Sequence, residues 1–348
     1  MKGIQISFLL NPLVLNMILI LSSAGDLETD NICGCLKQKK IEYLRINDTD
    51  FLLGRMSIEL SNDGFMFLFN NELIVIEKAT CIWIRKRGFF QDNPLLVKFN
   101  KIEISDIRSF MKREFETIHN FLIGFFDQKL FFNDKSLLNI NKLTILRYAK
   151  EEGLNIPSTF LTTKKEELNA FQKKGNFNKL LIKPISNNIG LQYNDENCIT
   201  PNFLLETKEK AYMPDSFFIS QFQNYIGKQI EIRAFYLDEN IYAMAIFSQQ
   251  DEKTKIDFRN YNLENPNRTA AFKLPKELTR KLTSLMKKIN ANAGSIDLIL
   301  SPDNKYYFLE INPFGIFSMI EDVCNYGLYE LVADSLINHS DHVKKNNK

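Results

Sequence analysis

The residues best suited to chemistry lie in a short segment near the C-terminus, Leu309-Glu310-Ile311-Asn312-Pro313. Glu310 and Asn312 are two residues apart, so on a β-strand both side chains point to the same face. Asp297 belongs to the preceding predicted strand, across a short hairpin. Two carboxylates and an amide oxygen on adjacent strands form a set of hard oxygen ligands, which suits a magnesium ion that also binds substrate phosphates. The alternative is that these side chains are solvated near strand ends.

Two lysines and an arginine could neutralise phosphate charge beside such a metal. Lys183 ends a hydrophobic predicted strand directly before Pro184, and a lysine there can hold a phosphate as a point charge. Lys142 begins a predicted helix one segment earlier; the alternative for either lysine is a solvated surface cation. Glu231 and Arg233 repeat the two-residue spacing on another predicted strand, Ile230–Leu237. That spacing places a carboxylate and a guanidinium on one face of the strand. The alternative is that the two residues take part in a cross-strand ion pair.

Other common chemistries find no support in the sequence. The chain has neither a G-x-x-x-x-G-K-[ST] nor a G-x-G-x-x-G loop, and its three histidines and five cysteines show no zinc spacing or catalytic triad. The isolated cysteines are typical of reduced thiols, so a cytoplasmic location is expected. The formal net charge of +2 gives no field that favours nucleic acid or an anionic membrane, and neither is expected as a partner.

The elements that must position these residues follow from length and periodicity. A chain of 348 residues, 45% hydrophobic and 25% charged, predicts a globular protein of two or three domains. The first, residues 17–135, begins with the β-α-β pattern of an open α/β domain. Residues 1–16 are interpreted as an extension from a misassigned start, and Ser105–Gly124 as a long helix with one apolar stripe.

Two further predicted domains carry the candidate residues. In residues 136–200, Asn141 is the expected N-cap of a helix over residues 142–152, which Gly153 ends. Residues 201–338 read as a strand-rich domain closed by a helix over residues 327–337. Residues 339–348 read as a disordered tail. The fold class is therefore α/β, with α+β character in the last domain.

The order of these residues resembles the ATP-grasp superfamily over residues 136–335. The segments that carry the resemblance are Lys142, Lys183-Pro184, Gln223-Asn224-Tyr225-Ile226, Glu231-Ile232-Arg233, Asp297 and Glu310-Ile311-Asn312-Pro313. The resemblance implies an ATP-grasp fold with an N-terminal pre-ATP-grasp α/β domain, a central lid domain and a C-terminal antiparallel-sheet domain. It also implies ATP and Mg²⁺ as cofactors.

The resemblance assigns a role to each candidate. For the nucleotide, it implies that Lys142 and Lys183 contact ATP phosphates, that Glu231 binds the ribose hydroxyls, and that a hinge binds adenine through the backbone groups of Gln223, Asn224, Tyr225 and Ile226. For the reaction, it implies that Arg233 and Lys183 act catalytically on the transferred phosphoryl group. It also implies that magnesium is held by Asp297, Glu310 and Asn312. The chain differs from the family pattern at two places. The segment Ser186–Gly190 corresponds to a glycine-rich loop that covers the phosphates, but it contains one glycine, Gly190. Asn224 stands where many relatives have an acidic residue.

A closer resemblance is to the peptide maturases of graspetide pathways, in the grasp-with-spasm branch. The segments that carry it are Trp83–Arg87, Asp257–Asn262, Asn265–Thr269 and Asn312–Gly315. Such enzymes join Asp or Glu side chains of a ribosomal precursor peptide to Ser, Thr or Lys side chains as ω-esters or ω-amides. The resemblance implies a precursor peptide, leader and core, as partner, and favours a homodimer. It makes Arg259 and Arg268, both in a predicted polar loop, candidates for contact with the substrate carboxylate or phosphoryl group.

Two alternatives remain open at this point. One is a carboxylate–amine ligase that adds an amino acid to a protein or peptide, and the other is a non-catalytic ATP-binding regulatory protein. The complete set of Asp297, Glu310 and Asn312 argues against the second alternative.

Overall fold

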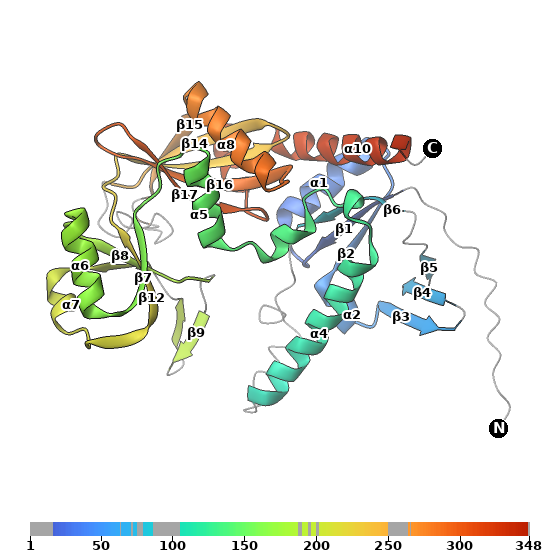
Figure 1. Cartoon of the computed structure of the whole chain (residues 1–348). Helices are drawn as coiled ribbons and strands as arrows, with labels where there is room; N and C mark the ends of the chain where they lie inside the picture. The colour runs from blue at the N-terminus through green and yellow to red at the C-terminus, as the bar shows by residue number, and fades with distance from the viewer. Residues whose placement is uncertain are drawn as a thin grey trace. The chain divides into compact units, whose positions relative to one another are not determined.

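The chain folds into two compact units, which the computed structural model in Figure 1 shows. The structure describes residues 17–62, 64–70, 72–74, 79–85, 105–186, 190–193, 196–199, 202–249, 264 and 266–346. Unit 1 combines residues 1–135 with residues 327–348, and unit 2 is formed by residues 136–326. Within the described residues, no helix is long and apolar enough to span a membrane.

Unit 1 is built on a small parallel sheet in the order β2-β1-β6. Its strands are β1 (Met17–Ser22), β2 (Tyr43–Asn47) and β6 (Ala79–Ile84), and helix α1 (Leu27–Gln38) joins the first two. Every residue of β1 and β6 is buried, as expected of parallel strands covered on both faces. The remaining described elements of unit 1 are α2 (Asp48–Leu52), the antiparallel strands β3 (Met56–Ser61), β4 (Gly64–Phe69) and β5 (Glu72–Ile74), α4 (Ser105–Phe125) and the short helix η3 (Gln128–Leu130).

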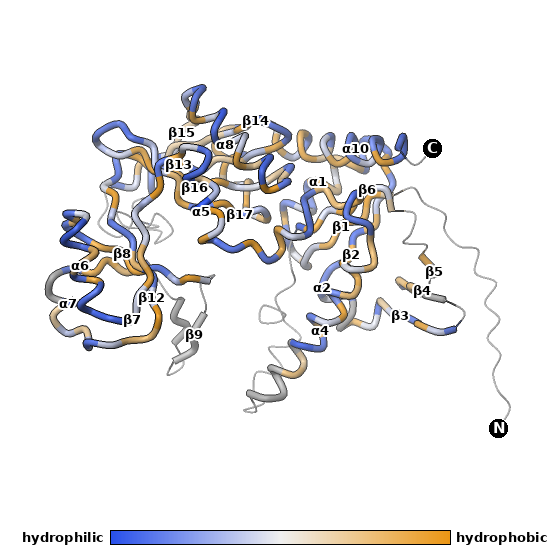
Figure 2. The backbone as a smooth tube through the Cα atoms, in the orientation of Figure 1, coloured by the Kyte–Doolittle hydropathy of each residue, from blue (hydrophilic) through white to orange (hydrophobic). Residues whose placement is uncertain are grey.

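The last helix, α10 (Leu328–Asn346), corrects the sequence interpretation in two ways. It packs on α1, β6 and β1 of unit 1, whereas the sequence assigned it to the third domain. It also continues through most of the segment predicted to be a disordered tail. The reason is that inward-facing residues recur past residue 339: Val343 is buried, and Ser340 Oγ lies 2.6 Å from Thr80 Oγ1 on β6. Figure 2 shows hydrophobic and hydrophilic residues interspersed along this helix.

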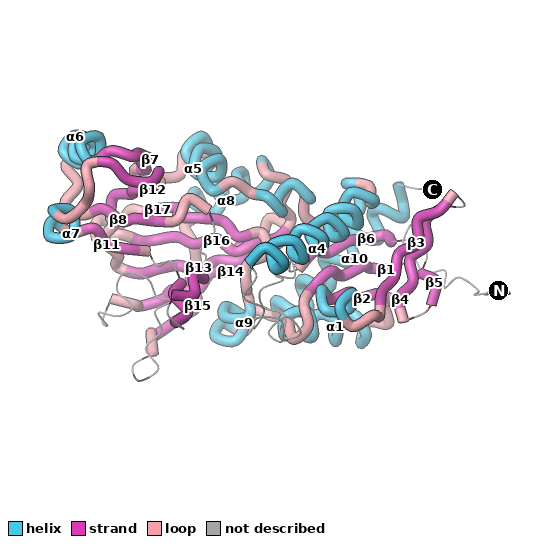
Figure 3. Tube along the Cα trace, turned by 90° about the horizontal axis from the view of Figure 1, so that it is seen from below, coloured by secondary structure: helices cyan, strands magenta, loops and turns pink. Residues whose placement is uncertain are grey.

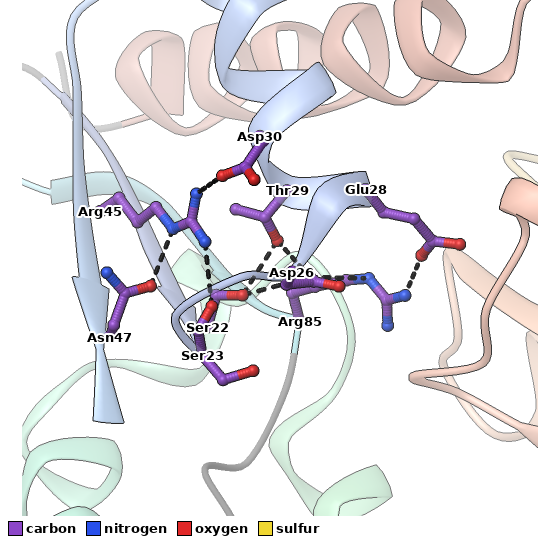
Figure 4. A network of polar contacts seen from close by, with 9 residues as sticks. All are labelled: Ser22, Ser23, Asp26, Glu28, Thr29, Asp30, Arg45, Asn47 and Arg85. Atoms are coloured by element: carbon purple, nitrogen blue, oxygen red, sulfur yellow. Dashed lines mark hydrogen bonds and ion pairs between the residues drawn. The ribbon is translucent and has the colours of Figure 1, made fainter. Parts of the chain in front are cut away.

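A buried polar network lies where β1 and β6 end and α1 begins (Figure 4). Asp26 Oδ2 accepts from Ser22 Oγ at 3.2 Å and from Thr29 Oγ1 at 2.5 Å. The Arg85 guanidinium pairs with Glu28, and its Nε lies 3.7 Å from Asp26 Oδ2. Desolvation lowers the pKa of Arg85, while Asp26 opposes that shift. The network therefore joins both strands to the helix by charge-assisted contacts and fixes where the chain leaves β6.

The first part of unit 2 is an antiparallel sheet in the order β11-β8-β12-β7. Its strands are β7 (Thr159–Lys164), β8 (Leu180–Lys183), β11 (Phe203–Leu205) and β12 (Ser216–Asn224). Helix α6 (Lys165–Gly175) covers one face through Leu168, which packs with Leu180 and Phe222. A hairpin of β9 (Gly190–Tyr193) and β10 (Glu196–Ile199) follows β8, and α7 (Thr207–Ala211) follows β11.

The second part of unit 2 is a five-stranded antiparallel sheet, whose strands lie side by side in Figure 3. In spatial order these are β15 (Arg268–Phe272), β14 (Asn240–Phe247), β13 (Ile230–Leu237), β16 (Ala293–Leu300) and β17 (Tyr306–Asn312). Helices α5 (Lys142–Glu151) and α8 (Lys276–Lys288) pack on one face, and α9 (Ser318–Cys324) contacts β13, β14 and β15. The 3₁₀ helix η4 (Lys135–Asn139) precedes α5.

Side-chain alternation decides which residues of this sheet face the helices. Ile230, Ile232 and Ala234 on β13 belong to the core that α5 and α8 complete. Since neighbouring side chains on a strand point to opposite faces, Glu231 and Arg233 must face away from these helices. The sheet therefore separates a hydrophobic face from a face that carries the charged residues.

The predicted cap of α5 is confirmed, and it gives a first testable effect. Asn141 Oδ1 accepts hydrogen bonds from the backbone N–H groups of Leu143 at 3.0 Å and Thr144 at 3.1 Å. Asn141→Ala removes this acceptor and is expected to lower the free energy of unfolding by about 1 kcal/mol, measured by urea denaturation. Asn141→Ser keeps a capping oxygen and is expected to lose much less. Equal losses in the two variants would contradict a capping role.

Candidate active site

A row of charged side chains crosses three strands on the face opposite α5 and α8. Strand register places Arg233 of β13 beside Asp297 of β16, and Asp297 beside Glu310 of β17. Arg233 Nη1 donates to Asp297 Oδ1 at 2.6 Å, and each of these two side chains is 11% exposed. The same register sets Asn312 opposite Ser295 at the end of β17. The prediction that Asp297, Glu310 and Asn312 share one face is thus confirmed in the register of the sheet.

Lys142 supplies a second cation to the row, because it is the first residue of α5 and lies beside Glu310 on the edge strand β17, while the rest of α5 covers the other face. Helix α5 packs against β17, and Lys142 Nζ lies 3.5 Å from Glu310 Oε2. Adjacent carboxylates on paired strands repel each other unless a cation compensates them. Arg233 and Lys142 provide that compensation for Asp297 and Glu310, so the two carboxylates are held side by side.

The ligand set of the row fits magnesium. Mg²⁺ binds proteins through one or two carboxylates and keeps places for substrate phosphates, and Asp297 with Glu310 provides that number. Asn312 is exposed, and its Oδ1 accepts a hydrogen bond from the backbone N–H of Phe314 at 3.1 Å. In the described part of the chain, no three His, Cys, Asp or Glu side chains gather as a metal-binding group. The fit therefore depends on two carboxylates and one amide oxygen.

The turn after Asn312 is packed closely against the row. Gly315 N donates to the carbonyl of Asn312 at 3.0 Å, and the carbonyl of Ile316 accepts from Ser295 Oγ at 3.1 Å and from Arg233 Nη2 at 3.3 Å. A Cβ at position 315 would lie 2.5 Å from Ser295 Cβ and 3.0 Å from the carbonyl oxygen of Asn312. Glycine is required there because the backbone passes so near the neighbouring strand.

Gly315→Ala is expected to lower the free energy of unfolding by about 1–3 kcal/mol, because the added methyl group overpacks the turn. The measurement is urea denaturation followed by circular dichroism. Gly34→Ala is the matched control, since nothing lies within 4 Å of a Cβ at that position in helix α1. The control is expected to be neutral or stabilising, because alanine favours a helix interior over glycine. An equal response of both variants would show that the turn is not tightly packed.

Glu231 stands near the row, in a cluster that the sequence did not reveal. Its Oε1 accepts from Lys228 Nζ and from Ser248 Oγ, both at 2.7 Å. Ser248 is fully buried, and the Lys228 side chain is only 2% exposed. Lys228 stands three residues before Glu231, but a lysine in a polar connection gives no sequence signal that it is buried.

The four-stranded sheet carries the other predicted nucleotide contacts. Lys183 at the end of β8 pairs with Gln221 on β12, and Gln223 lies two residues further along the same strand. All three side chains face away from α6, because Phe222 between the two glutamines packs on that helix. Gln223 Nε2 donates to Thr159 Oγ1 at 2.9 Å. Gln221 is 5% exposed, and its Oε1 has no hydrogen-bond partner in the described part of the chain.

The predicted hinge follows directly at the end of β12. The backbone N–H of Asn224 donates to the carbonyl of Ser158 at 3.0 Å, and Asn224 Oδ1 accepts from Ser158 N at 2.6 Å. The backbone N–H of Tyr225 donates to the carbonyl of Lys179 at 3.0 Å. Since the N–H groups of Asn224 and Tyr225 are bonded within the protein, the N–H of Ile226 is the next hinge group that could contact adenine.

A further candidate, Arg268, is not brought to the row. Arg268 was expected in a polar loop, but it begins the edge strand β15 and is exposed. Its guanidinium lies 4.8 Å from the ring of Phe247, which packs against the α5–α8 core on the opposite face of the sheet. Arg259 lies outside the described residues, as do residues 187–189 of the predicted phosphate-covering loop.

Comparison with known proteins finds solved structures that resemble the structure of this chain. No family model matches the chain, and no curated protein matches it either. The RiPP-associated ATP-grasp ligase of Chryseobacterium gregarium, solved with ADP and a leader and core peptide, aligns with a TM-score of 0.77 at 21% identity over 93% of this chain and 97% of that one. The macrocyclase MdnC of Microcystis aeruginosa MRC, bound to precursor peptide MdnA, aligns with a TM-score of 0.77 at 22% identity over 92% and 99%.

More distant structures extend the likeness. The ATP-grasp ligase PsnB, in complex with minimal precursor, Mg and ADP, aligns with a TM-score of 0.69 at 16% identity over 94% of this chain and 98% of that one. The D-alanine–D-alanine ligase of Bacillus anthracis, in complex with ATP, aligns with a TM-score of 0.52 at 14% identity over 95% and 98%. Both likenesses include unit 1 as well as unit 2, because they span nearly the whole chain.

Proposed function

The chain has the ATP-grasp fold, and from this premise we propose that it is an ATP-dependent peptide macrocyclase. The observation that carries the proposal is the row of Arg233, Asp297 and Glu310 on the face of the five-stranded sheet opposite α8, completed by Lys142 and Asn312. Two carboxylates beside two fixed cations are what a site for magnesium-bound triphosphate needs.

The described side chains take the following parts in this proposal. Asp297, Glu310 and Asn312 would hold Mg²⁺, which would neutralise negative charge on the phosphates. Lys183 and Lys142 contact the phosphates, Glu231 binds the ribose, and the hinge from Gln223 to Ile226 borders the adenine. Arg233 is oriented by Asp297 and by the Ile316 carbonyl, so it stabilises charge on the transferred phosphoryl group.

The proposed reaction has two steps. A carboxylate oxygen of an Asp or Glu side chain in the peptide attacks the γ-phosphorus of ATP, and the bond to the bridging oxygen breaks to release ADP. The product is an acyl phosphate. A hydroxyl or amine of the same peptide then attacks the acyl carbon, loses its proton, and displaces inorganic phosphate. Water must be excluded during both steps, because it would hydrolyse the acyl phosphate.

A peptide substrate is proposed from the pattern of structural likeness. The two ligases solved with leader, core or precursor peptides align at a TM-score of 0.77, whereas the D-alanine–D-alanine ligase aligns at 0.52. The likeness to the peptide ligases covers 93% and 92% of this chain, which is over nine-tenths of it. We therefore propose a ribosomal precursor peptide as the partner. A homodimer and a cytoplasmic location stay predictions.

Mass spectrometry tests the proposal directly. The protein is incubated with ATP, Mg²⁺ and a short peptide, rich in Thr and in Asp or Glu, that is encoded beside its gene. Loss of one or more water masses from the peptide, with ADP formed, is the expected result. A gain of one amino-acid residue mass would instead support the carboxylate–amine ligase. ATP binding without phosphate release in the presence of that peptide would support a non-catalytic regulator.

A further inference from the structure

The carboxylate of Glu231 is fixed by two donors that meet at one oxygen atom. Lys228 Nζ and Ser248 Oγ both lie 2.7 Å from Glu231 Oε1. The donors come from different parts of the chain: Lys228 precedes β13, and Ser248 directly follows β14. Two bonds from separate segments to one oxygen restrict the rotation of the carboxylate far more than either bond alone.

Burial excludes a direct role of Lys228 at the phosphates. Its side chain is 2% exposed, whereas that of Glu231 is 11% exposed. An ammonium this deeply buried needs a charged partner, because burying an isolated charge is very unfavourable. Lys228 therefore acts through Glu231, and Glu231 is the more accessible member of the pair.

The segment that contains Lys228 is also attached to the sheet of the charged row. The backbone N–H of Gln229 donates to the carbonyl of Leu300 on β16 at 2.8 Å, which holds the segment after Ile226 against the sheet. Glu231 is two residues from Arg233 on β13, so both side chains lie on the face of the row. A nucleotide that bordered the hinge and reached the row would pass Glu231.

We propose that Lys228 and Ser248 are positioning residues, which orient Glu231 so that the protein distinguishes a ribonucleotide from a deoxyribonucleotide. The inference rests on the proposed function, since it needs ATP or ADP to bind at this site. The physical reason is that a ribose diol donates hydrogen bonds to a carboxylate, and these charge-assisted bonds require a fixed acceptor. A site built to bind a hydroxyl group discriminates against the analogue that lacks it.

The test is isothermal titration calorimetry of the full chain with Mg²⁺ and either ADP or 2′-deoxy-ADP. Wild type is expected to bind ADP about 10-fold more tightly than 2′-deoxy-ADP. Lys228→Met is expected to weaken ADP binding about 10-fold and 2′-deoxy-ADP binding by less than about 3-fold, because only the hydroxyl contact depends on the orientation of Glu231. The preference for ribose therefore falls close to unity. A purely structural role would weaken both nucleotides equally.

Two other variants keep the inference testable. Ser248→Ala removes one hydrogen bond but leaves the Lys228–Glu231 pair, so it is expected to fold if Lys228→Met does not, and to lower the ribose preference about 3-fold. Lys287→Met is the matched control, because Lys287 Nζ also lies 2.7 Å from a glutamate oxygen, Glu239 Oε1, but both side chains are more than half exposed. This control is expected to bind both nucleotides as wild type does.

The outcomes separate the inference from the function on which it rests. If wild type prefers ADP and both Lys228→Met and Ser248→Ala reduce that preference, the positioning role is supported. If wild type binds ADP but the folded variants keep its preference, the inference is overturned while the proposed function stands. If wild type binds neither nucleotide, the proposed function fails and the inference fails with it.

Discussion

Replacing Arg233 by methionine is expected to lower the rate of peptide modification by about 10²-fold to 10³-fold, while ADP binding changes by less than about 3-fold. The guanidinium is held at 2.6 Å from Asp297 and donates to the Ile316 carbonyl at 3.3 Å, so it is oriented before substrate arrives. Such a preorganised cation contributes most when charge develops during phosphoryl transfer. The measurement combines steady-state release of ADP with titration calorimetry.

Two further variants show whether the guanidinium itself matters. Arg233→Lys keeps the positive charge but loses the planar donor arrangement, and it is expected to lose at least about 10-fold in rate. Arg280→Met is the control, because Arg280 forms an exposed pair with Glu277 at 2.8 Å in α8. Its activity should match wild type. A folded Arg233→Met variant with wild-type turnover would contradict the catalytic role of Arg233.

Strand pairing explains why part of the site was predictable. The sequence predicted β13 with the observed bounds, Ile230–Leu237, and placed Glu310 and Asn312 on one face. The faces of β13 follow from strict alternation, because a slip of one residue would move every apolar side chain out of the core. In β17 the alternation holds from Glu310 to Asn312, after an irregularity in the pairing between Asp297 and Leu298 of β16. The cap at Asn141 was equally local, since it depends only on the residue before the helix.

The missed elements are those whose local sequence does not show what they pack against. Strand β15 starts at Arg268 and lies at the sheet edge, where polar residues are common, so it read as a loop. Helix α10 was assigned to the third domain and not to unit 1, because its packing partners β1, β6 and α1 are distant in sequence. The sequence shows an amphipathic helix but not which surface it covers.

The unpredicted site contacts are long-range or buried charges. The approach of Lys142 to Glu310 follows from the packing of α5 on β17, which no local pattern encodes. Lys228 and Ser248 converge on Glu231 only after β13 and β14 have paired. Sequence reasoning treats a lysine as exposed by default, because buried lysines are rare unless they are paired.

Glu310→Gln is expected to lower turnover by about 10²-fold to 10³-fold and to raise the Mg²⁺ concentration for half-maximal rate by about 10-fold or more. The substitution keeps the shape of the side chain but removes one of two carboxylate charges beside the phosphates. It also leaves Lys142, 3.5 Å away, without the charge it faces. The measurement is ADP release over a range of Mg²⁺ concentrations, with Glu277→Gln, at an exposed position of α8, as the control.

Lys142→Met decides between two explanations of that result. If Glu310 mainly holds Lys142 in place, both substitutions break the same contact and should give the same Mg²⁺ dependence. If Glu310 holds the metal, Lys142→Met removes a competing cation, so the Mg²⁺ concentration for half-maximal rate should stay at the wild-type value or fall. The rate should still drop, because a phosphate contact is lost. A rise in that concentration equal to the rise in Glu310→Gln would remove Glu310 from the metal site and leave it as a partner of Lys142.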